Sequence, residues 1–228
     1  MEFRREFVQF EGLAKGDPRL RVRWAERQAC LDDRTETTPF DAHYIYHTAW
    51  AARCVAAIRP AYHIDISSSL YFSTLVSAFV PVRFYDYRPA AVLLDGLVAA
   101  QADLTCLPFP SDSVSSLSCM HVVEHVGLGR YGDPIDPRGD LKAIAELGRV
   151  LAPGGTLLFV VPVGRPKIAF NAHRIYAYRQ VRESFGALRL RQFALVADNP
   201  DAGLIVNAAE RVVDAQDYGC GCFWFEKP

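Results

Sequence analysis

The sequence lacks a long hydrophobic run. Its longest apolar stretches, such as residues 155–163, have the length of a strand and are too short to cross a bilayer. The first residues, MEFRRE, are charged, which argues against a secretory signal in this segment. We therefore expect a cytoplasmic protein that does not associate with a membrane.

An excess of charge of either sign is also missing. The chain has 25 Lys and Arg against 26 Asp and Glu, which gives a net charge of -1. A surface that binds nucleic acid or an anionic membrane needs clustered basic residues, so we predict no nucleic-acid partner. The six cysteines are scattered, and without a secretory signal we expect them to be reduced thiols. Nothing in the pattern indicates an oligomeric state.

Hydrophobic residues, at 50% of the 228, are abundant enough for one packed domain with an extension. Asp41 is a candidate N-cap for a stretch of helical spacing over 43–58, which Pro60 ends. From residue 60 onward, strand-like and helix-like segments alternate. We predict an N-terminal helical extension over residues 1–59, which could serve as a lid, and an α/β domain over residues 60–228.

Short apolar runs of strand length recur through the predicted domain. Helix-like segments at 70–79, 90–100, 141–151 and 176–185 lie between them. This alternation predicts a doubly wound, mostly parallel seven-stranded sheet with helices on both faces. The seven runs are 62–66, 82–85, 102–107, 115–123, 156–161, 188–197 and 220–225.

In doubly wound sheets, ligands bind beyond the carboxyl ends of the strands, where the strand order reverses. Asp65 lies at the end of the first predicted strand, and Ser67, Ser68 and Ser69 follow it. Asp86 ends the second strand, at the spacing of about 20 residues at which nucleotide sites often place a ribose-binding acid.

Later motifs extend this pattern in a fixed order. They are Asp103–Pro110 (DLTCLPFP), Val122–Val126 (VVEHV) and Arg149–Gly155 (RVLAPGG). Over roughly residues 60–165 the chain resembles class I S-adenosylmethionine (SAM)-dependent methyltransferases, with their Rossmann-like fold. The resemblance implies SAM as the cofactor, with Asp65 and its loop at the methionine end, Asp86 on the ribose and Asp103 on the adenine amino group.

The chain departs from that family in the loop after the first strand. The family has glycines where this chain has Ser67, Ser68 and Ser69. Glycine permits a positive φ and a close backbone approach to the ligand, whereas a serine hydroxyl can hydrogen-bond a ligand carboxylate. The loop therefore leaves two hypotheses open: a methyltransferase, or a non-catalytic methyltransferase-like binding or scaffold protein with a degenerate cofactor loop.

The chain also resembles a narrower methyltransferase-like family that is catalogued as a domain of unknown function. The motifs that carry this resemblance are DYRP (86–89), EHVGLGRYGD (124–133) and FNAHRI (170–175). The resemblance implies the fold and adds no activity.

His121, Glu124 and His125 are the first catalytic candidates. Their string, HVVEH, matches the H-x-x-E-H motif of a zinc peptidase class, in which two histidines on a helix bind zinc. Here the segment closes a strand and a third ligand is not evident, so we predict no metal. A polar pair at the rim of a cleft is the alternative for Glu124 and His125.

Two later loops supply further candidates. His173 is a candidate general base, with Asn171 to orient a substrate and Arg174 to neutralise an acid. Arg130 and Tyr131 are candidate substrate contacts, since an arginine can bind a carboxylate or a phosphate. The alternatives are an exposed loop and a capped helix. These polar residues predict a small-molecule substrate, a polar methyl acceptor, with a sugar-derived metabolite as one candidate.

Two other groups of residues keep two interpretations each. His43, Tyr44, Tyr46 and Trp50 could line a pocket or belong to the core. Cys220 and Cys222 suit alternating positions of a terminal strand better than a metal pair, because two thiols alone are an incomplete zinc set.

Overall fold

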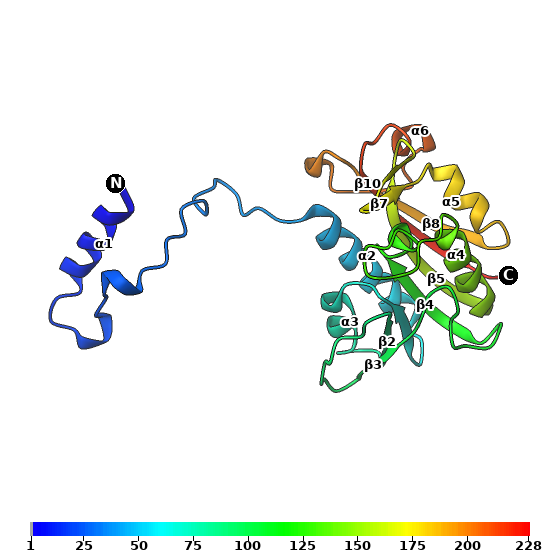
Figure 1. The fold of residues 1–228 in the computed structure, drawn as a ribbon, viewed down its shortest axis with the longest axis horizontal. Coiled ribbons are helices and arrows are strands. Elements are labelled where there is room, and N and C mark those ends of the chain that lie inside the picture. The colour runs from blue at the N-terminus through cyan, green and yellow to red at the C-terminus, as the bar shows by residue number, and fades with distance from the viewer. Residues whose placement is uncertain (1) are drawn as a thin grey trace. The chain divides into compact units, whose positions relative to one another are not determined.

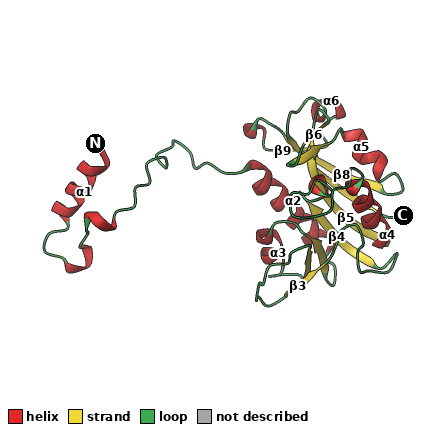
Figure 2. Ribbon diagram, viewed as in Figure 1, coloured by secondary structure: helices red, strands yellow, loops and turns green. Residues whose placement is uncertain are grey.

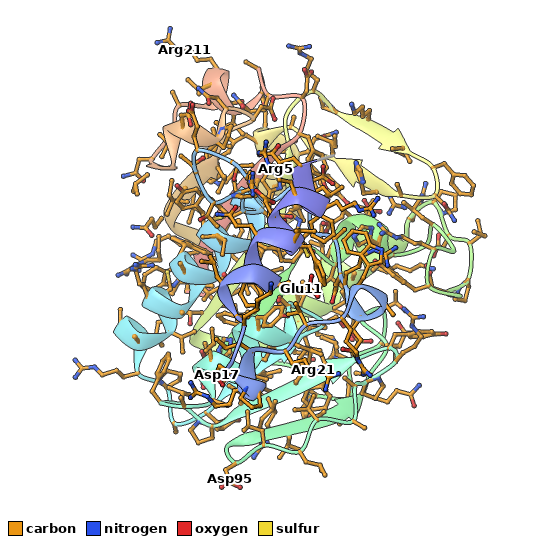
Figure 3. The ribbon with its side chains drawn as sticks, turned by 90° about the vertical axis from the view of Figure 1, so that its left-hand side faces the viewer. Arg5, Glu11, Asp17, Arg21, Asp95 and Arg211 are labelled. Carbon is orange, nitrogen blue, oxygen red and sulfur yellow. The ribbon has the colours of Figure 1, made fainter. Side chains whose placement is uncertain are left out.

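The computed structural model describes residues 2–228. It divides into two compact units, residues up to Phe40 and Asp41–Pro228. The first unit contains α1 (Glu2–Leu13) and two 3-10 turns, η1 (Pro18–Leu20) and η2 (Trp24–Glu26). No residue of α1 is buried, and charged side chains such as Arg5 and Glu11 are exposed on it (Figure 3). Within this unit, Phe7 packs edge-on against Trp24, with 5.0 Å between ring centroids.

The second unit is built on an eight-stranded sheet (Figure 2) with the order β3-β2-β1-β4-β5-β10-β8-β9. The first five strands in this order are parallel, and β10 runs antiparallel between β5 and β8. The predicted mostly parallel, doubly wound sheet is confirmed. The bounds are β1 (His63–Ile66), β2 (Val82–Asp86), β3 (Leu97–Gln101), β4 (Val114–Met120), β5 (Leu151–Val163), β8 (Arg189–Val196), β9 (Leu204–Val206) and β10 (Gly219–Glu226).

One predicted helix and one predicted strand are wrong. Residues 90–100 form a loop and then β3, and residues 102–107 form the turn that follows β3. Gly96 explains the difference, because its φ is +75 and a Cβ there would lie 2.8 Å from the carbonyl oxygen of Ser77. Gly96 also accepts a hydrogen bond from the Val82 amide at 2.8 Å, which sets β3 beside β2. The short β9, which we did not predict, adds the eighth strand at the other edge.

Helices cover both faces of the sheet (Figure 1). α2 (Ala42–Ile58) and α3 (Leu70–Val76) share one core cluster with one face, and α4 (Gly139–Val150) and α5 (Tyr178–Ser184) share the other. Alternate residues of β5 serve the two clusters, with Phe159 on one face and Leu158 on the other. Burying such a side chain contributes about 1.5–3 kcal/mol. The short α6 (Glu210–Val213) precedes β10, and β6 (Lys167–Ala169) pairs with β7 (His173–Ile175) as a separate hairpin.

α2 places an aromatic face against the sheet. Asp41 caps the helix by accepting a hydrogen bond from the Tyr44 amide at 3.1 Å, as predicted. Trp50 donates from Nε1 to Gln192 on β8 at 3.0 Å, so the helix is fixed to the sheet. α2 therefore lies in the same compact unit as β1, whereas we expected the α/β domain to begin at residue 60.

No helix within residues 2–228 is long and apolar enough to span a membrane.

Candidate active site

Two adjoining cavities lie beyond the carboxyl ends of the parallel strands. One has a volume of about 450 Å³ and is lined by four carboxylates, and we call it the acidic cavity. The other, of about 530 Å³, is lined by three histidines, and we call it the histidine cavity. They share a wall formed by Ser67, His121, His125 and Tyr131. The carboxylates are Asp86, Asp103, Asp133 and Asp136, and the histidines are His43, His121 and His125.

Asp86 and Asp103 line the acidic cavity. Asp86 is the last residue of β2, as predicted, whereas Asp103 lies two residues after β3 and not within the predicted strand over 102–107. Asp86 accepts a hydrogen bond from the Arg88 amide at 2.7 Å through Oδ1. Asp103 uses its own Oδ1 for the Thr105 amide at 2.8 Å and the Thr105 hydroxyl at 2.7 Å. Each carboxylate is thus oriented through one oxygen, and the second oxygen can accept hydrogen bonds from a ligand.

The serine loop adopts the backbone geometry that glycine usually supplies. Ser67 has φ +55, and its amide donates to the carbonyl oxygen of Tyr85 at 2.7 Å. Ser68 accepts a hydrogen bond from the Met120 amide at 3.1 Å, and Ser69 precedes the first residue of α3. A left-handed conformation costs a non-glycine residue about 1–2 kcal/mol. Ser67 and Ser68 therefore tie the loop to β2 and β4 while keeping the turn.

Asp65 lies beneath the cavities and lines neither of them. Its buried carboxylate accepts hydrogen bonds from Ser118, at 2.5 Å, and from Ser73. Because Ser118 donates to Asp65, its oxygen accepts from Nε2 of the buried His63, at 2.9 Å. Burial raises the pKa of Asp65 to about 6, and the serine hydrogen bonds oppose this rise. Asp65 thus belongs to a closed polar network that fixes the loop from below.

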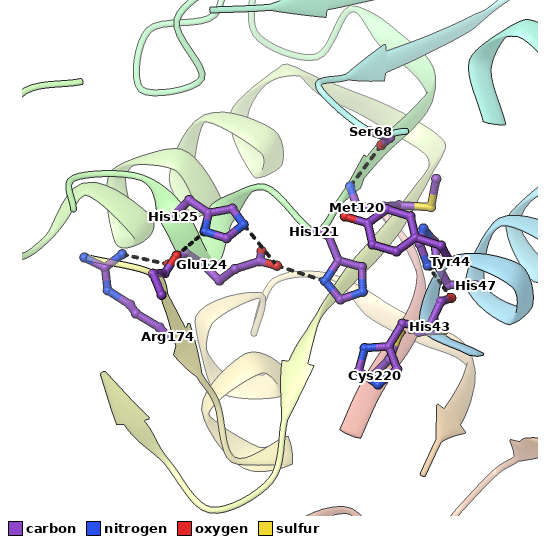
Figure 4. A network of polar contacts seen from close by, with 12 residues as sticks. His43, Tyr44, His47, Ser68, Met120, His121, Glu124, His125, Arg174 and Cys220 are labelled. Atoms are coloured by element: carbon purple, nitrogen blue, oxygen red, sulfur yellow. Dashed lines mark hydrogen bonds and ion pairs between the residues drawn. The ribbon is translucent and has the colours of Figure 1, made fainter. Parts of the chain in front are cut away.

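His121 and Glu124 form a pair at the end of β4 (Figure 4). His121 Nδ1 lies 2.9 Å from Oε1 of Glu124, which is 1% exposed. Burial raises the pKa of Glu124 to about 7 and lowers that of His121 to about 4. The His121 ring is therefore neutral, and when Glu124 is ionised the ring carries its proton on Nδ1, facing the carboxylate.

The segment from His121 to His125 is not the helix of a zinc peptidase. His121 has φ +57, and the next residues form a single 3-10 turn, η3 (Val123–His125). His125 donates from Nδ1 to the carbonyl oxygen of Ala172 at 2.6 Å, so its unprotonated Nε2 lies 3.9 Å from Glu124. His121 and His125 therefore both contact the Glu124 carboxylate and do not converge on one metal position. This geometry does not fit the zinc site of an H-x-x-E-H peptidase.

Tyr131 joins the two cavities. The guanidinium groups of Arg88 and Arg130 lie over its ring, at 5.0 Å and 5.1 Å from the centroid. Arg130 also donates to the carbonyl oxygen of Ala172 at 3.1 Å and lines the histidine cavity. A cation over an aromatic face gains about 0.5–1 kcal/mol at an exposed site. The structure therefore places both predicted substrate contacts of this loop at the cavities.

The other three candidates lie away from the cavity walls. Arg174 is buried and donates to the carbonyl oxygen of Val126 at 2.7 Å, and its Nε lies 3.5 Å from Asp140. It therefore holds the loop after β4. His173 packs against Tyr218, with 4.8 Å between centroids, and burial lowers its pKa. Asn171 is exposed. Neither cavity is lined by any of these three residues.

Some lining residues were not identified from the sequence. Tyr218, just before β10, stacks on His43 at 5.2 Å and lines the histidine cavity, and Lys142 of α4 lines the acidic cavity. No local pattern distinguishes either residue. His43 and Tyr44 do line a cavity, which was one of the two interpretations left open.

The strand order, the antiparallel β10 beside β5 and the cavities at the strand ends define the fold of class I SAM-dependent methyltransferases. A search of solved structures finds this fold in N-methyltransferase NodS from Bradyrhizobium japonicum WM9, solved with S-adenosyl-L-homocysteine (SAH). The TM-score is 0.56 at 14% identity, over 87% of this chain and 94% of that one.

Two further similar structures have different activities. One is 1,6-didemethyltoxoflavin-N1-methyltransferase from Burkholderia thailandensis, solved with 1,6-didemethyltoxoflavin and SAH (TM-score 0.57, 11% identity, 79% of this chain and 78% of that one). The other is the [4+2]-cyclase SpnF (TM-score 0.51, 16% identity, 78% and 81%). At such identities the likeness shows the fold alone.

The family model that matches is described as "Caenorhabditis protein of unknown function, DUF268" and covers residues 111–193. This match spans β4, the loop after it and most of the following elements up to β8. A search of curated protein sequences finds no match.

Proposed function

We propose that the protein is a SAM-dependent methyltransferase that acts on a small polar acceptor, such as a sugar-derived metabolite. The observation that carries this proposal is the pair of joined cavities, with Asp86 and Asp103 in one and the side chains of histidines and tyrosines in the other. A methyl transfer needs two ligands side by side, and a shared wall of four residues provides this arrangement.

The residues of the acidic cavity fit the nucleoside part of SAM. Its volume of about 450 Å³ lies within the range of about 300–1,000 Å³ that is usual for small-molecule sites. Asp86 would accept hydrogen bonds from the ribose hydroxyls, and Asp103 from the adenine amino group. The serine loop would face the methionine end, with Ser67 at the wall and Asp65 holding the loop from beneath. When bound, SAM supplies the methyl group.

The acceptor would enter the histidine cavity. His125 is the best placed group to take its proton, because Nδ1–H is held by Ala172 and Nε2 carries the lone pair. Arg130 would bind an acidic group of the acceptor from the same side. Much of the rate enhancement would come from holding the acceptor and the methyl donor in line.

Isothermal titration calorimetry with SAM and SAH tests the cofactor assignment, with thermal shift as a second measurement. Binding of both compounds is expected. No heat and no thermal shift at millimolar ligand would refute the methyltransferase and favour a non-catalytic binding protein. If SAM binds, transfer of labelled methyl groups to a panel of small hydroxylated and amino compounds identifies the acceptor.

A further inference from the structure

Three metal-ligating side chains from distant parts of the chain meet at the wall of the histidine cavity. They are His43 in the first turn of α2, His121 at the end of β4 and Cys220 in β10 (Figure 4). Their ligand atoms lie within 4.8 Å of one another. Two imidazoles and a thiol are a donor set that suits a borderline-soft ion such as Zn²⁺.

His121 is already oriented as a metal ligand. When Glu124 is ionised, Nδ1 donates to it at 2.9 Å and the lone pair lies on Nε2. Nε2 is buried and has no hydrogen-bond partner within residues 2–228, and the side chain is only 5% exposed. An unpaired buried polar atom costs about 1–3 kcal/mol. A carboxylate that orients a histidine toward a metal in this way is a recurrent feature of metal sites.

The other two ligands are also packed against their neighbours. His43 stacks between Tyr218, at 5.2 Å between ring centroids, and His121, at 5.7 Å. Cys220 is fully buried, with its Sγ 3.9 Å from that of Cys222. In a tetrahedral zinc site with bonds of about 2.0–2.3 Å, ligand atoms lie about 3.5 Å apart. Closing the site therefore requires the ligand atoms to approach one another by about 1 Å, and the nearly parallel rings of His43 and His121 to turn so that their lone pairs converge.

We propose that His43, His121 Nε2 and Cys220 Sγ bind one Zn²⁺ ion, whose fourth position opens to the histidine cavity. His43 and His121 line that cavity, whereas Cys220 lies outside its lining, so the open position faces the cavity. Three protein ligands with an open fourth position are the arrangement of catalytic zinc sites. The fourth ligand would be water or an oxygen atom of the acceptor, and the Cys220 thiol would release its proton on binding.

The test uses the full chain, purified without chelator and measured in the absence of SAM. Metal analysis is expected to find about one Zn²⁺ per chain. Titration of chelator-treated protein with Co²⁺ is expected to produce a thiolate-to-cobalt charge-transfer band. Cys220→Ala should abolish the band and weaken Zn²⁺ binding more than about tenfold, and Glu124→Gln should weaken it about 10- to 100-fold.

Two further variants complete the design. His121→Asn removes a ligand while tolerating the left-handed backbone, which asparagine adopts readily, and it should also lose Zn²⁺. Cys54→Ala is the matched control, because Cys54 is a buried free thiol on α2, the helix that carries His43. It should bind Zn²⁺ like the wild type.

Several outcomes would overturn the proposal. These are a wild-type chain that binds neither Zn²⁺ nor Co²⁺, a Cys220→Ala protein that keeps the charge-transfer band, or tight binding of copper without zinc. If Cys220→Ala does not fold, as circular dichroism would show, His43→Gln replaces it with the same expectation. Because no SAM is present, failure here is separate from failure of the proposed methyltransferase function.

Discussion

The two cavities share one wall but are assembled in different ways. The acidic cavity uses Asp86, the last residue of β2, and Asp103, two residues after β3, and these two strands are parallel neighbours. The histidine cavity combines the start of α2, the end of β4 and the residue before β10, which are far apart in sequence. We infer that the two halves of the site can be altered separately, because they depend on different elements.

The cavities also differ in electrostatics. Four carboxylates line the acidic cavity, with Arg88 and Lys142 as nearby cations. In the histidine cavity, burial lowers the pKa of both His43 and His121 to about 4, so both rings are neutral at pH 7. Neutral rings present lone pairs to an electrophile or a metal, whereas carboxylates attract hydrogen-bond donors such as hydroxyl and amino groups.

The largest effect is expected at Asp65, which we place in neither cavity. Its pKa of about 6 in the folded state lies above its usual 3.8, so the folded protein retains a proton that the unfolded chain loses. The stability that depends on this group is therefore full below about pH 4 and falls as the pH rises toward about 6. A shift of this size corresponds to about 3 kcal/mol.

Urea unfolding of the wild type and of Asp65→Asn between about pH 4 and pH 7 measures the pH-dependent contribution of Asp65 to the free energy of unfolding. Across that pH range, the free energy of unfolding should fall by about 3 kcal/mol more in the wild type than in Asp65→Asn. Asp95→Asn, at an exposed turn, should reproduce the wild-type profile. Parallel pH profiles for the wild type and Asp65→Asn would refute the raised pKa of Asp65. A loss of SAH affinity as large as that of an Asp86 variant would place Asp65 at the ligand.

The second effect concerns Asp86. If its carboxylate binds the ribose hydroxyls, Asp86→Ala should weaken SAH binding about 10- to 100-fold, as loss of hydrogen bonds to a charged group costs about 1.5–3 kcal/mol. Calorimetry with SAH measures this change, and the exposed Asp95→Ala serves as the control. Zn²⁺ binding should stay at the wild-type level, because Asp86 lines only the acidic cavity. Unchanged SAH affinity would refute the ribose assignment, and a parallel loss of Zn²⁺ would contradict the separation of the cavities.

The parallel sheet could be predicted from the alternating pattern, and the place of Asp86 from the rule that parallel strands end at a common edge. Asp103 was assigned only through the family resemblance, because the sequence predicted it inside a strand over residues 102–107, whereas it follows β3. The same rule failed to distinguish Asp65. That residue also ends a strand, but Ser73 and Ser118 enclose its carboxylate, and no local pattern reveals which side of a turn a side chain takes.

The histidine cavity could be predicted only in part. His121, Glu124 and His125 were found because they lie together in sequence, and the segment closes a strand as predicted instead of forming the helix of a zinc peptidase. The proximity of Tyr218 and Cys220 to His43 depends on β10 inserting between β5 and β8, a long-range pairing that spacing alone does not reveal. Arg174 was a candidate to neutralise an acid, with a surface arginine as the alternative, whereas the fold buries it against carbonyl oxygens.

The smallest expected effect tests the wall that the cavities share. Ser67 has φ +55, and its hydroxyl donates to the carbonyl oxygen of Tyr85 at 3.2 Å. Ser67→Gly relieves about 1–2 kcal/mol of backbone strain but loses a hydrogen bond of about 1 kcal/mol and gains flexibility in the unfolded chain. The net change in unfolding free energy should therefore stay within about 1 kcal/mol.

Ligand binding should respond more clearly than stability. Removal of the Ser67 side chain opens both cavities at their common wall, so SAH should bind more tightly, by up to about tenfold if close backbone approach limits affinity. Ser111→Gly is the control, because Ser111 is an exposed turn residue that lines neither cavity, and it should leave SAH affinity near the wild-type value. Weaker SAH binding by Ser67→Gly would show that the serine hydroxyl itself contacts the ligand, and the loop would then be a specialised cofactor loop, with serine taking over the role of glycine.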